Sequence, residues 1–415
     1  MRVLALLLLL LAAPLAAQQV PAPASSPAPS FTPALAAETL EAVRAASAEG
    51  LDPSDYGEAR LAAALAGTDA AAIDAAARAS WLALARDYAA GRTPEAARRG
   101  WRGPGPRADE AFLAGRLSAA LAAASPRAHL EGLLPTHPDY AALRAALAAA
   151  TAADRPLIRA NLDRWRWFPR QPGERYLLVN IPAFELKLVE GGQTLATHRV
   201  IVGKPATPTL SFSTVATGVI LNPKWVVPRS IIAESVGALI ARSPAAARAR
   251  GYRWTGSGPT LSVVQGPGPT NSLGQVKLDM PNPHSIFIHD TPARALFDRQ
   301  SRAFSHGCIR TDKALDLAAR LLADVPGLSR PALDSMVATG QTQRVALSRQ
   351  VPVHIVYLTA TPGPGGTIRR LPDLYGRDAA VISALGPGPA LRTSERTAEA
   401  GAEAGCYAEM PNRPA

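Results

Sequence analysis

The sequence predicts an α+β protein in which an alanine-rich helical N-terminal domain precedes a mainly β domain with an inserted helical segment. From about Leu35 to Trp167 alanine dominates and β-branched residues are scarce, which favours helix. From residue 173 onward, short runs rich in Val, Ile and Leu are separated by Pro or Gly, as in strands joined by tight turns. A chain of 415 residues fits two or three domains of about 100–200 residues each.

The first 17 residues have the pattern of a signal peptide. Arg2 precedes the apolar run 3–11, and small residues follow up to Ala17. The run is shorter than the roughly 20 apolar residues of a membrane-spanning helix, and no Cys follows it that would carry a lipid anchor. We therefore expect export to the periplasm without stable membrane insertion. Residues 18–34, rich in Pro and Ala, are expected to form a flexible leader.

The helical region, 35–167, has one clear apolar face. Its members recur at helical spacing: Ile73, Ala77, Trp81, Leu84 and Tyr88. An aromatic stripe of this kind is typical of a core, so no chemistry is assigned to it. Gly and Pro residues between 100 and 107 are expected to break the helices.

The mainly β domain is expected to span 173–380. Its predicted strands are Tyr176–Ile181, Glu185–Val189, His198–Val202, Thr214–Leu221, Val276–Met280, Ser285–His289 and Pro352–Leu358. Within it, 228–250 reads as helical, with Ile231, Ser235, Leu239 and Ile240 on one face. Such an insertion either forms a lid or subdomain beside a site or only packs against the domain without a role at a site.

Another helix is predicted after residue 311, with Asp312 as its N-cap and an inward face of Leu315, Ala318, Leu322 and Val325. Apolar periodicity ends near Leu385, so 385–415 is expected to be a disordered tail.

Charge argues against nucleic acid as a partner. Lys and Arg number 44 against 33 acidic residues, a net charge of +11, but the charges are scattered along the chain and an exported protein rarely meets nucleic acid. An anionic extracellular polymer rich in carboxylates is the favoured partner, unless the arginine excess reflects coding bias alone.

The two cysteines, Cys308 and Cys406, allow one disulfide. Cys406 lies in the Glu/Ala/Gly/Pro-rich tail, which offers little structure to crosslink. A free reactive thiol at Cys308 is the favoured interpretation, and the role of Cys406 stays open.

The stretch 285–310 brings together residues suited to acyl transfer. Strand alternation places Phe287 and His289 on one face. Cys308 lies between Gly307 and the start of a predicted helix, where free backbone N–H groups lower a thiol pKa and stabilise an oxyanion. A cysteine nucleophile needs a base or a positive field, and histidine titrates near neutral pH.

Two other interpretations of these residues remain open. One is a zinc site of His284, His289, His306 and Cys308, which lacks an HExxH or CxxC spacing and a carboxylate ligand. The other is a buried structural cysteine with core histidines. We expect no metal and no cofactor.

The segments 288–292, Ile-His-Asp-Thr-Pro, and 305–310, Ser-His-Gly-Cys-Ile-Arg, resemble the signature of L,D-transpeptidases with a YkuD-type catalytic domain, spacing included. The segments 202–208 and 222–228 are similar to the long periplasmic (YcbB-type) subgroup, as are 161–167 before the domain and 373–378 after it. The similarity covers about 155–380.

The resemblance implies a peptidoglycan enzyme. Such enzymes attack the carbonyl of the third residue of a tetrapeptide stem, release the terminal D-Ala, and pass the acyl group to an amine of another stem, giving a 3-3 crosslink. Cys308 would carry the thioester, and His289 would take and return the proton. The N–H groups of Gly307 and Cys308 would form the oxyanion hole, and carbapenem β-lactams would acylate the thiol.

The resemblance also suggests roles around this pair. Arg310 would bind a stem carboxylate, and Trp225 would line the donor pocket. Ser305 and Phe287 are grouped with these substrate-binding residues, and His306 assists catalysis. The helices after Pro228 would form a capping subdomain, about 228–270.

The sequence departs from the subgroup in one respect. We find no peptidoglycan-binding module between the alanine-rich helices and Trp165, since 141–153 is only a short alanine-rich run. Two alternatives to the transpeptidase stay open: a cysteine-dependent L,D-carboxypeptidase or hydrolase that uses water as acceptor, and a catalytically silent wall-binding protein. The acceptor, the oligomeric state and any activating partner are not predicted.

Overall fold

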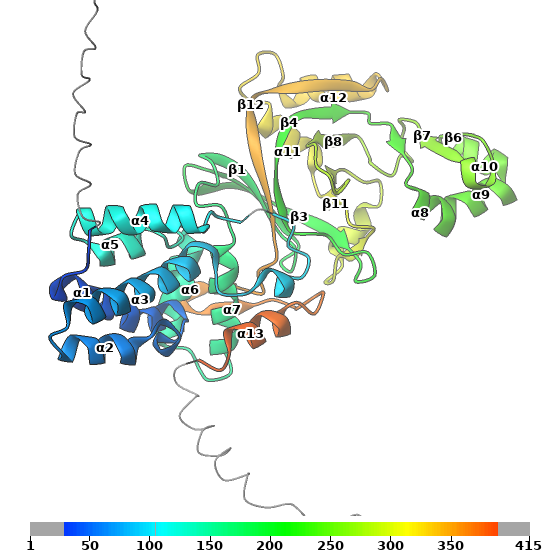
Figure 1. Cartoon of the computed structure of the whole chain (residues 1–415). Helices are drawn as coiled ribbons and strands as arrows, with labels where there is room; N and C mark the ends of the chain where they lie inside the picture. Colours follow the sequence, from blue (N-terminus) through cyan, green and yellow to red (C-terminus); the bar gives the residue numbers. More distant parts are fainter. Residues whose placement is uncertain (1–28, 104, 389–415) are drawn as a thin grey trace, which may run out of the picture.

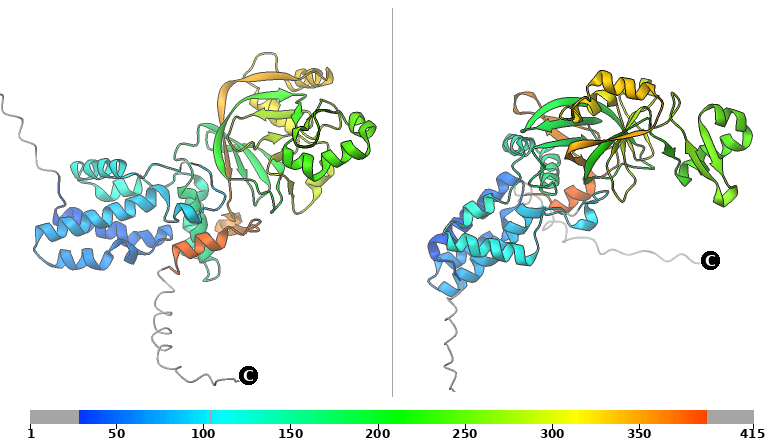
Figure 2. Two further views of the ribbon diagram at one scale, coloured as in Figure 1. Left: turned by 45° about the vertical axis from the view of Figure 1, so that its right-hand side comes forward. Right: turned by 90° about the horizontal axis from the view of Figure 1, so that it is seen from above.

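The computed structural model describes residues 29–103 and 105–388. The structure has three parts: a helical N-terminal domain, a β-barrel, and a small subdomain inserted into the barrel sequence. The helical domain and the inserted subdomain lie on opposite sides of the barrel (Figures 1 and 2). The predicted fold class is therefore confirmed. The predicted signal peptide and Cys406 lie outside the described residues.

The helical domain is built from α-helices of 6 to 21 residues. They are α1 Pro33–Ala45, α2 Glu58–Ala66, α3 Ala70–Ala90, α4 Glu110–Ala122, α5 Pro126–Glu131, α6 Pro138–Ala148 and α7 Arg155–Arg166, with short 3₁₀ turns η1 Ala46–Glu49, η2 Pro53–Tyr56 and η3 Glu95–Ala97. Asp69 caps α3 by accepting from two backbone N–H groups of its first turn. The predicted apolar face of α3 is buried throughout, so that prediction is confirmed.

The helical domain begins slightly before the predicted Leu35. Helix α1 starts at Pro33, behind the N-cap Thr32. Phe31 is buried in the helical core, and its N–H donates to Asp74 Oδ1 at 2.7 Å. Phe31 lies near the end of the stretch that was expected to be a flexible leader. The Pro/Ala-rich composition of that stretch did not indicate that this aromatic residue is buried.

The β domain is a closed barrel. Its strands are β1 Arg175–Asn180, β2 Glu185–Glu190, β3 Gln193–Gly203, β4 Phe212–Leu221, β8 Val276–Asp279, β9 Ile288–His289, β10 Ala303–Ser305, β11 Ile309–Thr311 and β12 Gln343–Val356. They pair in the order β10-β3-β11-β9-β8-β4-β12-β1-β2, and the additional β2–β3 pairing closes the ring. Closure leaves β10 outside the ring on the edge of β3, and removes most free strand edges.

The barrel core is filled by Val, Leu and Ile side chains from alternate strand positions and by helix α11 Ala314–Leu321. In α11 the predicted inward residues Leu315 and Ala318 are buried. The helix starts after Lys313, which carries no side-chain cap, so the predicted capping by Asp312 is wrong. Asp312 instead forms an ion pair with Arg199 on β3, at 2.8 Å. Helix α12, Arg330–Ala338, packs beside α11.

The inserted subdomain has its own small core. A three-stranded sheet, β5 Trp225–Val226, β7 Ser262–Gln265 and β6 Tyr252–Thr255, carries α8 Arg229–Ile231, the π-turn η4 Ile232–Val236, α9 Gly237–Arg242 and α10 Pro244–Ala249, with the 3₁₀ turn η5 Gly258–Thr260. The helical prediction for 228–250 holds, but the face is shifted: Val236 and Ile240 are buried, whereas Ser235 is exposed. The π-turn rotates the residues after it, which 3.6-residue spacing does not anticipate.

The chain returns to the helical domain at its C-terminal end. After the hairpin β13 Ala360–Pro362 and β14 Ile368–Arg370, joined through η7 Pro364–Gly366, helix α13 Asp378–Leu385 packs on α7. Val381 and Leu385 are buried in the helical core. Within the described residues, no helix is long and apolar enough to cross a membrane.

Candidate active site

Three adjacent strands bring the predicted site residues onto one face of the barrel wall. His289 on β9 pairs with Arg310 on β11 and with Lys277 on β8. Their neighbours Ile288 and Ile309 pair with each other and are buried in the barrel core. Because side chains alternate along a strand, the opposite face carries Lys277, Phe287, His289, Cys308 and Arg310. We call this set the Cys308 face.

The predicted strand Ser285–His289 is shorter than expected, but its alternation is confirmed. Only Ile288 and His289 pair as a strand, and Ser285 adopts a positive φ of 53°. Ile286 and Ile288 are nevertheless both buried in the core. Asn282 holds the preceding turn by donating to the carbonyls of Met280 and Ile286, both at 2.8 Å.

The His289 ring is held through its Nδ1 atom. Nδ1 lies 2.5 Å from the backbone carbonyl oxygen of Asp290, so Nδ1 carries the proton and Nε2 is left as the acceptor. Burial lowers the pKa of His289 to about 4, with Arg310 and Lys277 acting in the same direction and the carbonyls of Asp290 and Leu273 opposing it. The imidazole is thus neutral at pH 7 and able to accept a proton.

A tight turn fixes the carbonyl that holds His289. The Asp290 carboxylate is buried, accepts from the N–H of Gln275 at 2.9 Å, and is paired with Arg294 at 3.3 Å. Gly274 lies against it with a φ of +62°, and a Cβ there would approach Asp290 Oδ2 to 2.3 Å. Only glycine fits this position.

Cys308 is partly exposed, and its Sγ lies 3.7 Å from the carbonyl oxygen of Ser285. Burial raises the pKa of the thiol, while the N–H of Phe287 and the charges of Lys277 and Arg310 oppose the increase. The predicted helix start beside Cys308 is wrong. The chain continues into β11, and α11 begins only at Ala314.

The turn that presents Cys308 is closed by Ser305. Its Oγ donates to the Cys308 carbonyl at 2.5 Å and accepts from the Gly307 N–H at 3.2 Å. Gly307 has a φ of +107°, a conformation that favours glycine. Because the Gly307 N–H is engaged by Ser305, the Cys308 N–H is the donor left for an oxyanion among the two predicted.

Thr209 anchors the same turn from behind. It is fully buried, donates from Oγ1 to the Gly307 carbonyl at 2.8 Å, and accepts from the Gly203 N–H at 2.9 Å. Tyr375 accepts from the Thr209 N–H at 3.2 Å and donates to the Gly203 carbonyl at 2.7 Å. These bonds connect the cysteine turn to β3 and to the segment 373–378.

His306 faces the inserted subdomain. Its Nε2 lies 2.5 Å from Glu234 Oε2, and the other oxygen of Glu234 lies 3.0 Å from Lys204 Nζ. Trp225 lies in strand β5 and packs against the core of the inserted subdomain. The role of Trp225 as a lining of the donor pocket stays a prediction.

The four residues of the alternative zinc site do not form one cluster. His284 packs its ring on Phe212, with centroids 4.9 Å apart. In the stretches 29–103 and 105–388 no group of three or more His, Cys, Asp or Glu side chains is arranged to hold a metal ion.

The comparisons with known proteins follow the same division of the chain. Residues 174–355 match the sequence model of the YkuD L,D-transpeptidase catalytic domain, and residues 29–147 match one described as a scaffold domain. Residues 174–355 belong to the YkuD family. Cys308, His289 and Arg310 all fall within this YkuD domain.

A curated relative from Haemophilus influenzae, named "Putative L,D-transpeptidase", is 30% identical over 222 residues. The match covers 49% of this chain and 45% of that protein, so the chain spans about half the length of the relative. Among solved structures, an L,D-transpeptidase from Mycobacterium smegmatis is 14% identical with a TM-score of 0.23, covering 44% of this chain and 58% of that one. A mutant Enterococcus faecium L,D-transpeptidase is 12% identical with a TM-score of 0.23, covering 44% and 50%.

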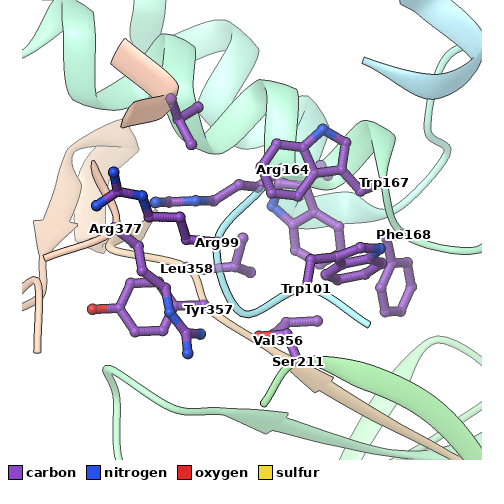
Figure 3. Close-up of a pocket in the computed structure, with 12 residues that line it drawn as sticks. Arg99, Trp101, Arg164, Trp167, Phe168, Ser211, Val356, Tyr357, Leu358 and Arg377 are labelled. Carbon is purple, nitrogen blue, oxygen red and sulfur yellow. The ribbon is translucent and has the colours of Figure 1, made fainter. Parts of the chain in front are cut away.

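The two flanking motifs, 161–167 and 373–378, meet at the junction between the helical domain and the YkuD domain. Arg164 pairs with Asp378 at 2.6 Å, and the Arg377 guanidinium stacks on both Tyr357 and Tyr375, 4.7 Å from each ring centroid. Figure 3 shows Arg, Trp and Tyr side chains of both domains around one cavity at this junction. Cys308 and His289 do not line it, so we assign the motifs to domain docking.

Sequence reasoning missed four residues that shape the site: Lys277, Asp290, Thr209 and Glu234. Lys277 alternates with apolar residues in a predicted strand, a pattern that would have placed it on the face of His289 once the register was known. Glu234 is one exposed acidic residue in a helical segment, and only the tertiary structure brings it to His306.

Proposed function

We propose that the protein is an exported peptidoglycan L,D-transpeptidase that forms 3-3 crosslinks through a thioester on Cys308. The observation that carries the proposal is the placement of Cys308 directly before β11, the strand that pairs with His289 on β9, together with the orientation of the His289 ring by the Asp290 carbonyl. The family of residues 174–355 agrees with this chemistry.

In the first half-reaction, the Cys308 thiol gives its proton to His289 Nε2 while Sγ attacks the carbonyl of the third stem residue. The bond between that carbonyl carbon and the D-Ala nitrogen breaks, and His289 returns the proton to the leaving amine. With its pKa lowered by burial, the imidazole is unprotonated at pH 7, so its Nε2 lone pair is free to accept the thiol proton. The Cys308 N–H then faces the oxyanion.

In the second half-reaction, an amine of another stem attacks the thioester, and its proton passes to His289 and on to the departing thiolate. Arg310 has no carboxylate partner among the described residues, and it lies beside His289 in register. Its guanidinium therefore suits a stem carboxylate. Phe287 and Ser305 flank the same turn, and the inserted subdomain is suited to cover bound stems.

A competing use of the same thioester is transfer to water, which would make the protein an L,D-carboxypeptidase. The test is to incubate the full chain and its Cys308→Ala variant with disaccharide-tetrapeptides and to identify the products by mass spectrometry. Dimers lacking one D-Ala, formed by wild type alone, are the expected result. Tripeptides without dimers would instead assign the hydrolase, and a product pattern independent of Cys308 would overturn both.

A further inference from the structure

Lys277 has an unusual position for a lysine. It lies in the middle of three paired strands, opposite Ile220 on β4 and opposite His289 on β9. Its side chain is half-buried, and Nζ lies 3.5 Å from the centroid of the Phe287 ring. An ammonium over an aromatic face is stabilised by the ring quadrupole, but that contact does not neutralise its charge.

Among residues 29–103 and 105–388 no carboxylate forms an ion pair with Lys277, although the charge of Asp279 acts on it. Asp279 lies on the same face of β8, two residues further, but its Oδ2 accepts from Arg344 Nε at 2.6 Å and from Thr217 Oγ1 at 3.2 Å. Within the described part of the chain, Lys277 has neither an ion pair nor a side-chain hydrogen bond. A half-buried cation without a counterion is costly unless an anion forms near it.

The chemistry of the other residues on the Cys308 face shows which of them can become the anion near Lys277. His289 is neutral or cationic, Arg310 is cationic, and Phe287 is apolar. Cys308 is therefore the one member of the face that ionises to an anion. Phe287 is the residue beneath the lysine ammonium, and its backbone N–H also faces the Cys308 sulfur.

We propose that Lys277 is a positioning residue that stabilises the Cys308 thiolate through its charge, so that it sets the pH at which the nucleophile forms. His289 then serves mainly to carry protons between the thiol and the amines. The inference rests on the proposed nucleophilic role of Cys308. Thiol ionisation is measured without peptidoglycan, however, so failure of the enzyme proposal and failure of this one are distinguishable.

The experiment measures the alkylation rate of Cys308 by iodoacetamide against pH, resolved by peptide mass spectrometry in the full chain. Cys406 in the same chain is an internal reference for the reagent. The parent carries His289→Gln, because Lys277 also lowers the pKa of His289 and a protonated His289 would itself stabilise the thiolate. Lys277→Met is compared with Lys277→Arg, which keeps the charge, and with Lys187→Met, a half-buried strand lysine on β2.

We expect Lys277→Met to raise the alkylation midpoint by roughly one pH unit, a tenfold loss of rate at pH 7. Lys277→Arg and Lys187→Met should stay within about 0.3 units of the parent, and thermal unfolding should verify that all variants are folded. A Lys277→Met midpoint equal to or below that of the parent would overturn the inference. So would a shift of the same size in Lys187→Met. If the midpoint shifts as expected but no crosslinked product forms in the peptidoglycan assay, the inference stands and the proposed function fails.

Discussion

Glu234 of the inserted subdomain is joined to His306, two residues before Cys308, by a contact of 2.5 Å between Oε2 and Nε2. The same carboxylate holds Lys204 Nζ at 3.0 Å. The subdomain projects from the barrel (Figure 1), and Glu234 is a side chain that ties it to the cysteine turn. The side chains of Glu234, His306 and Lys204 are all accessible to solvent, so the contacts between them are weak and can open and close.

We predict that Glu234→Gln loosens the inserted subdomain without unfolding it. Amide hydrogen exchange in 229–242 should become faster, whereas the Tm should stay unchanged because an exposed ion pair contributes little. The control is Glu185→Gln on β2, which removes an ion pair with Arg369 on β14. Equal exchange in wild type and Glu234→Gln would contradict the connection.

The connection should also depend on pH in one direction. Hydrogen bonds to His306 and Lys204 lower the pKa of Glu234 below its ordinary value. A carboxylate with a lowered folded-state pKa contributes fully above its ordinary pKa and is lost as pH falls through the lowered value. The difference in exchange between wild type and Glu234→Gln should therefore persist at pH 5 to 7 and vanish in stronger acid.

His289 should make the folded state less stable as pH falls below about 6.5. Its pKa is lowered to about 4 in the fold, so between these values the unfolded chain binds a proton that the native state does not. The loss is up to roughly 3 kcal/mol at pH 4. Urea unfolding of wild type and His289→Gln at pH 7 and pH 4.5 measures it: the gap between the two proteins should move in favour of the variant in acid. If the difference in unfolding free energy between wild type and His289→Gln is the same at pH 7 and pH 4.5, His289 is not desolvated.

Gly274→Ala should displace the carbonyl that holds His289. The substitution forces a side chain into a positive φ and against the Asp290 carboxylate, at a cost of about 2–4 kcal/mol. Chemical denaturation measures the stability, and the rate of Cys308-dependent product formation should fall at least tenfold. Gly191→Ala is the matched control, since Gly191 also has a positive φ, of 57°, but apart from its two chain neighbours no residue has an atom within 4 Å of the point that its Cβ would occupy. A similar loss of rate in both variants would contradict the role of Gly274.

Thr209→Val should loosen the cysteine turn while keeping its shape. Valine leaves the Gly307 carbonyl and the Gly203 N–H without their buried partner, which costs about 1–3 kcal/mol. Thr209→Ser keeps the hydroxyl and should recover most of the product-forming rate. If valine and serine behave alike, the hydroxyl does not position Cys308.

The sequence predicted the parts of the site that depend on local pattern. Alternation in 285–289 placed His289 opposite the core residues Ile286 and Ile288, and the spacing of α3 predicted its buried face. Pattern alone did not show that 309–311 pairs with both β9 and β3, because a three-residue strand has too little periodicity. The helix predicted after residue 311 begins at Ala314, but the strand between it and Cys308 was not predicted.

The electrostatics of the site could not be predicted for a different reason. The neutral state of His289, the unpaired charge of Lys277 and the bridge from Glu234 to His306 all depend on strand register and on burial between segments far apart in sequence. Glu234 and His306, for example, are 72 residues apart. Local sequence carries no information on such contacts.

The central claim is that Cys308 carries the acyl group, and trapping that species tests it most directly. The full chain, Cys308→Ala and Cys406→Ser are mixed with disaccharide-tetrapeptide, quenched in acid, and measured as intact proteins and as peptides by mass spectrometry. We predict an adduct equal to the stem without its D-Ala on the Cys308 peptide of wild type and Cys406→Ser, and none on Cys308→Ala. An adduct that persists in Cys308→Ala, or crosslinked product formed by that variant, would contradict the account.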